Sequence, residues 1–342
     1  VMKSKNLLNK KIPNGFTLIE LLISMVLGLI LIGGVYSVFT ENARTSQLVQ
    51  ATSRTQENGR FALSELVTRA RMIGYMGCLA QLDVTGPDFI NTLNSTGDDY
   101  YFDLTAGQLE VIDYDGGNLP IPLNGDIDPL VGTDVLVIRG LSSADYNLKG
   151  SMPNTSADLK ISGNGSQISE GDVLFLSDCQ KGAIFQVTNT NIQGGTGDRN
   201  VVHNTGGASV PGNASKQLSN GSPFAEDATV QQFSSTVFFI APASFTNNQG
   251  DTVYSLWQKN GSAPEFELVS GIEDLEVWLG EDSGTDGVPD RVVRPDQLAA
   301  ADARNVVTID FRIRANSIDP VEGPDPIKRD FFASVKLRNR GI

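Results

Sequence analysis

The stretch "FTLIELLISMVLGLILIGGVYSVF", residues 16–39, decides how the rest of the chain is organised. Glu20 is the only one of its side chains that carries a charge. As a helix, the stretch would span ~36 Å at 1.5 Å per residue, which is enough to cross a bilayer. We therefore expect a membrane-spanning helix with one carboxylate near its start, and that carboxylate needs a physical explanation.

The segment before this stretch is basic. Residues 1–15 contain four lysines and no acid. Such a bias holds a flanking segment in the cytoplasm and sends the chain beyond residue 40 to the other side, which is the periplasm in a cell with two membranes. A secretory signal peptide is the alternative, but its apolar core is shorter and ends at a small-residue cleavage site. "YSVF" follows here, so we expect the helix to be retained.

A cleavage site is expected on the other side of the helix, at "PNG", residues 13–15. Pro13 disfavours helix for Asn14, and Gly15 has no side chain to obstruct a protease. This predicts an extended, accessible segment followed by a helix that begins at Phe16. Cleavage after Gly15 would create a new ammonium group on Phe16.

That ammonium group would give Glu20 a partner. A lone carboxylate in the membrane costs ~2.5–3.5 kcal/mol on insertion scales. Residues i and i+4 share one face of a helix, so the amine of Phe16 would lie one turn from Glu20. Pairing within the chain would lower the cost, and pairing with the amine of a neighbouring copy would fix an axial offset between two helices.

The stretch "KKIPNGFTLIELLISMVLG", residues 10–28, resembles the leader and first helix of type IV prepilins. The shared features are the basic leader, Gly15 at the cleavage point, Phe16 after it and Glu20 as the fifth mature residue. The resemblance implies that a dedicated membrane peptidase removes residues 1–15 and methylates the amine of Phe16. The alternative is an uncleaved signal anchor with an accidental glutamate.

The helix is expected to continue beyond the membrane, because no proline occurs between Pro13 and Pro87. Residues 40–80 form this extension, which is polar at first and then amphipathic. An apolar stripe at helical spacing should dock on a globular core; its members are Ala62, Leu63, Leu66, Val67, Ala70 and Ile73. The glycines of "GYMGC", residues 74–78, should end the helix.

Residues 81–342 change to a period of two, which indicates strands with one buried face. The clearest examples are "NVVTIDFRIRA", residues 305–315, and "FFASVKLRNR", residues 331–340. Shorter candidates are residues 133–140, 172–179, 183–189, 236–243 and 274–280. Residues 145–170 and 190–232 are rich in Gly, Asn, Ser and Thr and are expected to be flexible surface loops. The predicted fold is α+β: a long N-terminal helix, transmembrane in its first half, packed on an antiparallel β-sheet domain.

Composition and motifs exclude several functions. The net charge of −14 over 342 residues argues against contact with nucleic acid, which needs clustered Lys and Arg. His203 is the only histidine and is expected to lie exposed in a loop. No GxSxG elbow, HExxH motif or phosphate-binding loop is present. We expect no enzymatic activity and no cofactor. A membrane-anchored periplasmic enzyme or binding protein would need a pocket of convergent polar groups, which no motif suggests.

The loop "EDSGTDGVPDRV", residues 281–292, is a weak calcium candidate. Asp282, Asp286 and Asp290 occupy positions 1, 5 and 9 of a calcium-loop pattern, and Gly287 stands where the turn needs glycine. Position 3 is Gly284, which supplies no side-chain ligand. A plain acidic turn is therefore the favoured interpretation.

The chain has two cysteines, Cys78 and Cys179. Two are too few for a disulfide-stapled mini-fold and too far apart for a CxxC site. The predicted topology places both outside the cytoplasm, where one structural disulfide is favoured over two buried thiols. The bond would tie the end of the helix to the sheet.

Three landmarks resemble the PilW group of minor pilins: "RMIGYMGC" ending at Cys78, "SDC" ending at Cys179, and the terminal "VKLRNR". The resemblance implies a minor pilin of a complex that primes type IV pilus assembly, lies at or near the tip and supports twitching motility. Implied partners are other minor pilins, the major pilin, the prepilin peptidase and the inner membrane, with a tip adhesin as a further candidate. The implied location is the inner membrane with a periplasmic head, and then the pilus. A pseudopilin of a type II secretion system would share every N-terminal feature.

Overall fold

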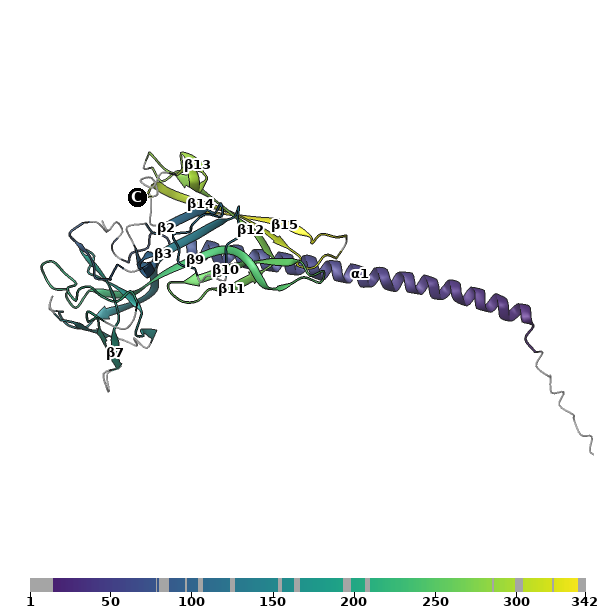
Figure 1. Ribbon diagram of the computed structural model, residues 1–342, viewed down its shortest axis with the longest axis horizontal. Helices are drawn as coiled ribbons and strands as arrows, with labels where there is room; N and C mark the ends of the chain where they lie inside the picture. The colour runs from purple at the N-terminus through teal and green to yellow at the C-terminus, as the bar shows by residue number, and fades with distance from the viewer. Residues whose placement is uncertain are drawn as a thin grey trace, which may run out of the picture. The chain divides into compact units, whose positions relative to one another are not determined.

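The computed structural model describes residues 15–77, 79, 86–95, 97–103, 107–123, 127–152, 156–162, 167–192, 198–206, 210–284, 286–298, 304–321 and 323–337. The basic segment 1–14 lies outside this set. The chain divides into two compact units, Val1–Ala51 and Thr52–Ile342. One long helix, α1 (Leu18–Ala70), contributes to both units (Figure 1).

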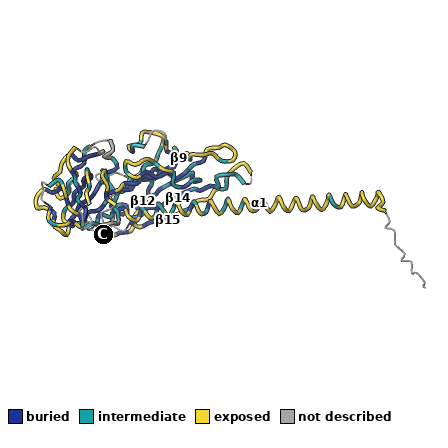
Figure 2. The backbone as a smooth tube through the Cα atoms, turned by 90° about the horizontal axis from the view of Figure 1, so that it is seen from below, coloured by how far each residue is buried: buried dark blue, intermediate teal, exposed yellow. Residues whose placement is uncertain are grey.

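The two parts of α1 have different surroundings. Every residue from Leu18 to Phe39 is exposed except Gly28, which is half-buried (Figure 2). In the second unit, the buried positions of α1 recur every three or four residues, as a helix with one apolar face requires; they are Thr55, Gly59, Ala62, Leu66 and Ala70. This confirms the predicted stripe. The helix ends at Ala70, earlier than expected, and passes through turns to Gly74, which has a φ of 83°.

The second unit contains two β-sheets, which confirms the α+β prediction (Figure 1). The larger sheet has eleven strands: β1 (Phe89–Asn91), β2 (Leu109–Asp113), β3 (Asp134–Leu148), β4 (Asp158–Ser162), β5 (Val173–Ser177), β6 (Gly182–Gln186), β7 (Asn189–Ile192), β8 (Arg199–Val202), β9 (Thr229–Thr246), β10 (Thr252–Asn260) and β11 (Phe266–Ser270). Its strands pair antiparallel except β1 and β6, which run parallel.

The smaller sheet has four strands in the order β13-β12-β14-β15. They are β12 (Ile272–Glu281), β13 (Arg291–Val293), β14 (Val306–Asn316) and β15 (Lys328–Lys336). Two short 3₁₀ helices, η1 (Gly97–Phe102) and η4 (Pro295–Gln297), complete the regular structure named here. β14 buries every second residue, and its register places Phe311 opposite both Val277 of β12 and Ala333 of β15. The alternation predicted for residues 305–315 is therefore confirmed.

The end of α1 packs in a core that both sheets share. Ala62, Leu66 and Ala70 belong to one buried cluster with Leu136 of β3 and Phe311 of β14. A second cluster lies on the other face of the large sheet, around Val137, Phe175 and Phe239. Burial of these apolar side chains is the main force that holds α1 against the sheets.

Gly59 lies against the smaller sheet. A Cβ atom at this position would lie 2.3 Å from the ring of Phe331 in β15. A side chain here would therefore have to displace that ring. The glycine thus lets the helix backbone pack directly on an aromatic ring.

The two segments predicted to be loops contain strands, so that prediction was wrong for part of their length; the described residues between β8 and β9 do form a loop. Residues 145–170 hold the end of β3 and all of β4, and residues 190–232 hold β8 and the start of β9. Their sparse apolar residues form a third buried cluster; among them are Leu148, Leu159, Ile161, Val201, Leu218, Phe224 and Val230. A few well-placed apolar side chains were sufficient to order polar segments of the chain.

His203 is also not where the sequence suggested. Its side chain is completely buried, with the ring 4.9 Å from the ring of Phe185. Nε2 lies 3.2 Å from the carbonyl oxygen of Lys216, and Nδ1 has no hydrogen-bond partner among the described residues. Burial disfavours the charged imidazolium and lowers the pKa of His203 to about 4.

This burial predicts an acid-sensitive head. An unfolded chain binds a proton at His203 below the ordinary pKa of 6.5, whereas the folded chain binds it only near 4. The folded state should therefore lose stability as the pH falls from 6.5 towards 4. Because His203 is the only histidine, its ring resonance in a fragment of residues 52–342 can be followed by NMR without ambiguity. A titration midpoint near 6.5 would contradict the buried, neutral ring.

Candidate functional site

The predicted cleavage point lies just outside the helix. Gly15, Phe16 and Thr17 precede α1, and α1 begins at Leu18 rather than at Phe16. The side chain of Phe16 is 86% exposed, and a Cβ atom at Gly15 would meet nothing within 4 Å. Among the described residues, nothing packs against Gly15, and Phe16 is exposed, while cleavage between them stays a prediction.

Glu20 closes a capping box at the start of α1. Its Oε2 accepts hydrogen bonds from the backbone N–H of Thr17, at 3.1 Å, and from the hydroxyl of Thr17, at 3.0 Å. The backbone N–H of Glu20 in turn donates to the hydroxyl of Thr17 at 3.3 Å. This reciprocal T-x-x-E arrangement satisfies two donors that a helix start otherwise leaves unpaired.

The capping box corrects the predicted start of the helix, whereas the pairing of Glu20 with the amine of a cleaved Phe16 stays a prediction. Phe16 precedes the N-cap residue Thr17, so it does not occupy a helical position one turn before Glu20. The pattern T-x-x-E before an apolar run was present in the sequence and could have identified the helix start. In the part of the chain that the structure describes, Oε1 of Glu20 has no hydrogen-bond partner, so this oxygen remains able to accept one.

The segment after the cap is apolar over its whole circumference. From Leu18 to Phe39, Glu20 is the only charged residue, and the large apolar side chains are 52–80% exposed. Such a helix needs lipid or other apolar helices around it. Its 22 residues would span ~33 Å at 1.5 Å per residue. By length and composition, this part of α1 can cross a membrane.

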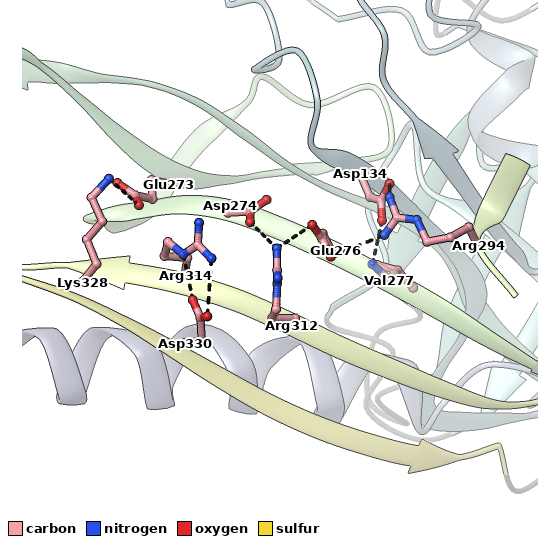
Figure 3. Close-up of polar contacts among 10 residues, drawn as sticks. All are labelled: Asp134, Glu273, Asp274, Glu276, Val277, Arg294, Arg312, Arg314, Lys328 and Asp330. Carbon is pink, nitrogen blue, oxygen red and sulfur yellow. Dashed lines mark hydrogen bonds and ion pairs between the residues drawn. The ribbon is translucent and has the colours of Figure 1, made fainter. Parts of the chain in front are cut away.

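In the second unit, the polar face of the smaller sheet carries ion pairs between strands (Figure 3). Arg312 of β14 contacts Asp274, at 2.8 Å, and Glu276, at 2.5 Å, both on β12. Arg314 contacts Asp330 of β15 at 2.8 Å, and this hydrogen-bonded pairing lowers the pKa of Asp330. Oppositely charged pairs between neighbouring strands each add a modest stabilisation to the sheet.

Asp134 links the two sheets. It begins β3, and its side chain is fully buried. One carboxylate oxygen accepts the N–H of Val277 at 2.6 Å, and the other contacts Arg294 at 3.2 Å (Figure 3). Burial raises the pKa of Asp134 to about 7 although both contacts favour the ionised form. This contact joins β3 of the larger sheet to β12 of the smaller sheet.

The carboxylates of the weak calcium candidate accept hydrogen bonds within one turn of the chain. Asp290 accepts from the backbone and hydroxyl of Ser283 at 2.8 and 2.7 Å, and Asp282 accepts from the N–H of Gly287 at 2.7 Å. Asp286 accepts from Val288 two residues on. The described residues contain no group of three or more His, Cys, Asp or Glu that could hold a metal ion. The three carboxylates shape the turn locally.

The second unit also has one small surface cavity of about 200 Å³. It is lined by Asn91, Leu93, Asn94, Ser95, Phe102 and Asp103. Among the described residues that line it, Asp103 is the side chain able to act as a general acid or base.

Only one of the two cysteines lies among the described residues. Cys78 lies outside the described residues, whereas Cys179 follows β5 with a positive φ of 68°. Gly77, the neighbour of Cys78, lies against Gln231: a Cβ there would be 2.7 Å from its side-chain oxygen. Gln231 pairs with Phe175 of β5. The chain next to Cys78 thus passes close to the strand that leads to Cys179, and the disulfide stays a prediction.

Residues 11–36 match a family model described as the prokaryotic N-terminal methylation motif. The matched residues include Gly15, Phe16 and Glu20, which are the residues predicted to take part in cleavage, methylation and assembly. No curated protein and no solved structure matches the chain. The comparisons therefore concern residues 11–36 in the first unit, and the description of the head rests on its structure alone.

Proposed function

We propose that this chain, a type IV pilin-like protein by its N-terminal methylation motif, is a minor pilin of the PilW group. The observation that carries the proposal is the bare apolar helix Leu18–Phe39 with a single carboxylate at Glu20, joined in one chain to a folded β-rich head. Such a subunit works by being assembled, and we propose no enzymatic activity for it. Its apolar helix would exchange the lipid of the inner membrane for the helices of neighbouring subunits.

Processing prepares the subunit for this exchange. Cleavage after Gly15 removes the leader but leaves the Thr17–Glu20 capping box in place, because neither residue is lost. The new amine of Phe16 then lies just before the cap. Oε2 of Glu20 is occupied by Thr17, so Oε1 is the oxygen that would receive the amine of a neighbouring subunit. An ion pair between subunits in an apolar medium would set the axial offset of adjacent helices.

We place the head in the periplasm before assembly and at or near the pilus tip afterwards. The lysine bias before the helix favours this orientation. Other minor pilins and the major pilin are the proposed partners, and the prepilin peptidase is the processing enzyme. Loss of the subunit should reduce the number of pili and twitching motility.

Mass spectrometry of two fractions tests this function. Protein from sheared filaments should begin at N-methylated Phe16, and protein from membranes should contain the same processed form and its precursor. An unprocessed N-terminus, or an unmethylated start at another residue, would contradict the processing.

The same fractions separate a minor pilin from a secretion pseudopilin. A pseudopilin would be processed identically but would be absent from sheared type IV pili, and its deletion would stop protein secretion instead of twitching. Processed protein that is found only in membranes, together with a secretion defect, would replace the proposal with that role.

A disulfide between Cys78 and Cys179 is proposed for the head. The bond would close a loop of about 100 residues, for which chain entropy gives up to ~4.7 kcal/mol of stabilisation. We expect non-reducing peptide mapping to recover the two cysteines in one linked fragment, and reduction to lower the free energy of unfolding. Recovery of both as free thiols from protein that was alkylated before lysis would refute the bond.

A further inference from the structure

β15 forms one edge of the smaller sheet, and no described strand pairs with its outer side. It pairs with β14 alone in the order β13-β12-β14-β15. Leu337 donates to Val307, and Ser317 donates to Ile327, so the odd-numbered residues of this strand direct their backbone groups towards β14. The N–H and C=O groups of the even-numbered residues therefore point outwards; these residues are Lys328, Asp330, Phe332, Ser334 and Lys336. All five are exposed.

This edge lacks most of the devices that keep an exposed strand from pairing. β15 is nine residues long, contains no proline and stays in continuous register with β14, without a bulge. Phe332 lies at its centre, and its side chain is 68% exposed. A long, regular edge with an apolar centre is a template for an added strand. The lysines at the two ends of β15 hinder the pairing of an added strand only in part.

The charge of this edge indicates the partner. Lys328 and Asp330 are already paired, with Glu273 at 2.9 Å and with Arg314 at 2.8 Å. Arg329 and Lys336 are exposed and have no ion pair among the described residues, although the chain as a whole carries a net charge of −14. The edge is thus locally basic on an acidic protein. It suits an extended segment that carries carboxylates on both sides of an apolar side chain.

A second copy of the chain fits poorly. Antiparallel pairing of two β15 strands about Phe332 would align position 328 with position 336 of the other copy, because the two numbers sum to twice 332. Lys328 would then face Lys336 at both ends of the ladder. Like charges directly opposite each other destabilise a strand pair. In any register, two copies of β15 would also bring together two strands of the same net positive charge, so the charge of this edge favours an acidic partner.

We propose that β15 accepts an added β-strand from a different pilin-like subunit of the same filament, and that this strand is acidic with an apolar residue opposite Phe332. The backbone groups of β15 would supply affinity, while Phe332, Arg329 and Lys336 would select the partner. The identity of the partner as a pilin-like subunit rests on the proposed function; the free, basic edge does not.

Site-specific crosslinking in cells that express the full chain tests the inference. A photo-reactive phenylalanine analogue at Phe332 should form an adduct with another pilin-like subunit, and peptide mapping should place the adduct in a segment with Asp or Glu on both sides. The same analogue at Phe266, a 42% exposed aromatic residue on β11, is the matched control and should give no such adduct. An adduct to a second copy of this chain, or none at position 332, would overturn the inference.

A proline variant tests whether a strand is added. Ser334→Pro removes an outward N–H without breaking a bond to β14, so the fold should survive. It should lower the adduct yield by about tenfold, which corresponds to 1.4 kcal/mol. Ser334→Ala, which keeps the N–H, should not lower it. Lys336→Glu should also lower the yield, whereas Lys160→Glu, at an exposed position of β4, should not. A yield that Ser334→Pro leaves unchanged would rule out strand addition.

The two proposals fail in different ways. If processed protein is present in filaments but position 332 gives no adduct, then the inference about β15 is wrong and the minor pilin function stands. If the protein is absent from filaments but position 332 forms the acidic-strand adduct in membranes, then the function fails and the edge site stands.

Discussion

Filaments should be lost when Glu20 is replaced by glutamine. Glu20→Gln keeps the capping box, because a Gln at this position can still accept a hydrogen bond from the N–H of Thr17. It removes the charge that we propose to pair with the amine of a neighbouring Phe16. An ionised carboxylate beside an apolar helix is costly unless it is paired, and the cap alone would be kept by an uncharged glutamine, so the substitution separates the charge from the cap. We expect at least about a tenfold drop in pili per cell, counted by electron microscopy.

Thr17→Ala is the matched control because it affects the cap and not the charge. It removes the hydroxyl that Glu20 contacts at 3.0 Å and should cost the helix start about 1 kcal/mol. Filaments should still form. Pili of normal number and length with Glu20→Gln, or equal losses with both variants, would show that capping is the only task of Glu20.

The second large effect is expected in the head, from Leu66→Ala. Leu66 is completely buried between α1 and the two sheets, in the cluster that includes Leu136 and Phe311. Removing three carbon atoms there leaves a cavity that the surrounding strands cannot fill. The expected loss is ~3 kcal/mol of unfolding free energy, measured by denaturant titration of the full chain in detergent.

Leu31→Ala makes the same chemical change in the other part of α1. Leu31 is 69% exposed in the first unit, so its truncation should leave the unfolding of the head unchanged. Its effect should instead appear in filament assembly. Equal destabilisation of the head by both substitutions would contradict the division of α1 into two parts with separate tasks.

Much of this fold could be predicted because apolar residues recur at regular spacing in the sequence of its main helix and of β14. The stripe through Ala62, Leu66 and Ala70 repeats at helical spacing, and β14 alternates without interruption, so local sequence was sufficient. The helix start was misplaced because the T-x-x-E cap was overlooked. Its signal was present in four residues of the sequence.

The strands in the two polar segments could not be predicted from the local sequence. β4 and β8 have five and four residues, and their pairing joins Leu159 to Val201 across more than forty residues of sequence. Short strands acquire their order from partners rather than from their own propensity. His203 was misjudged for the same reason, because Phe185 and the backbone of Lys216 bury it from elsewhere in the fold. The free edge of β15 likewise depends on which strand ends a sheet.

The hydrogen bonds between Thr17 and Glu20 also have a consequence for subunits that are not part of a filament. Glu20 finds two donors within its own chain. If the chain is a pilin subunit as proposed, a newly inserted copy could therefore stay in the bilayer without a partner, and a helix released from a filament could return to that state. We therefore expect the membrane to act as a reservoir from which the same molecules are drawn repeatedly.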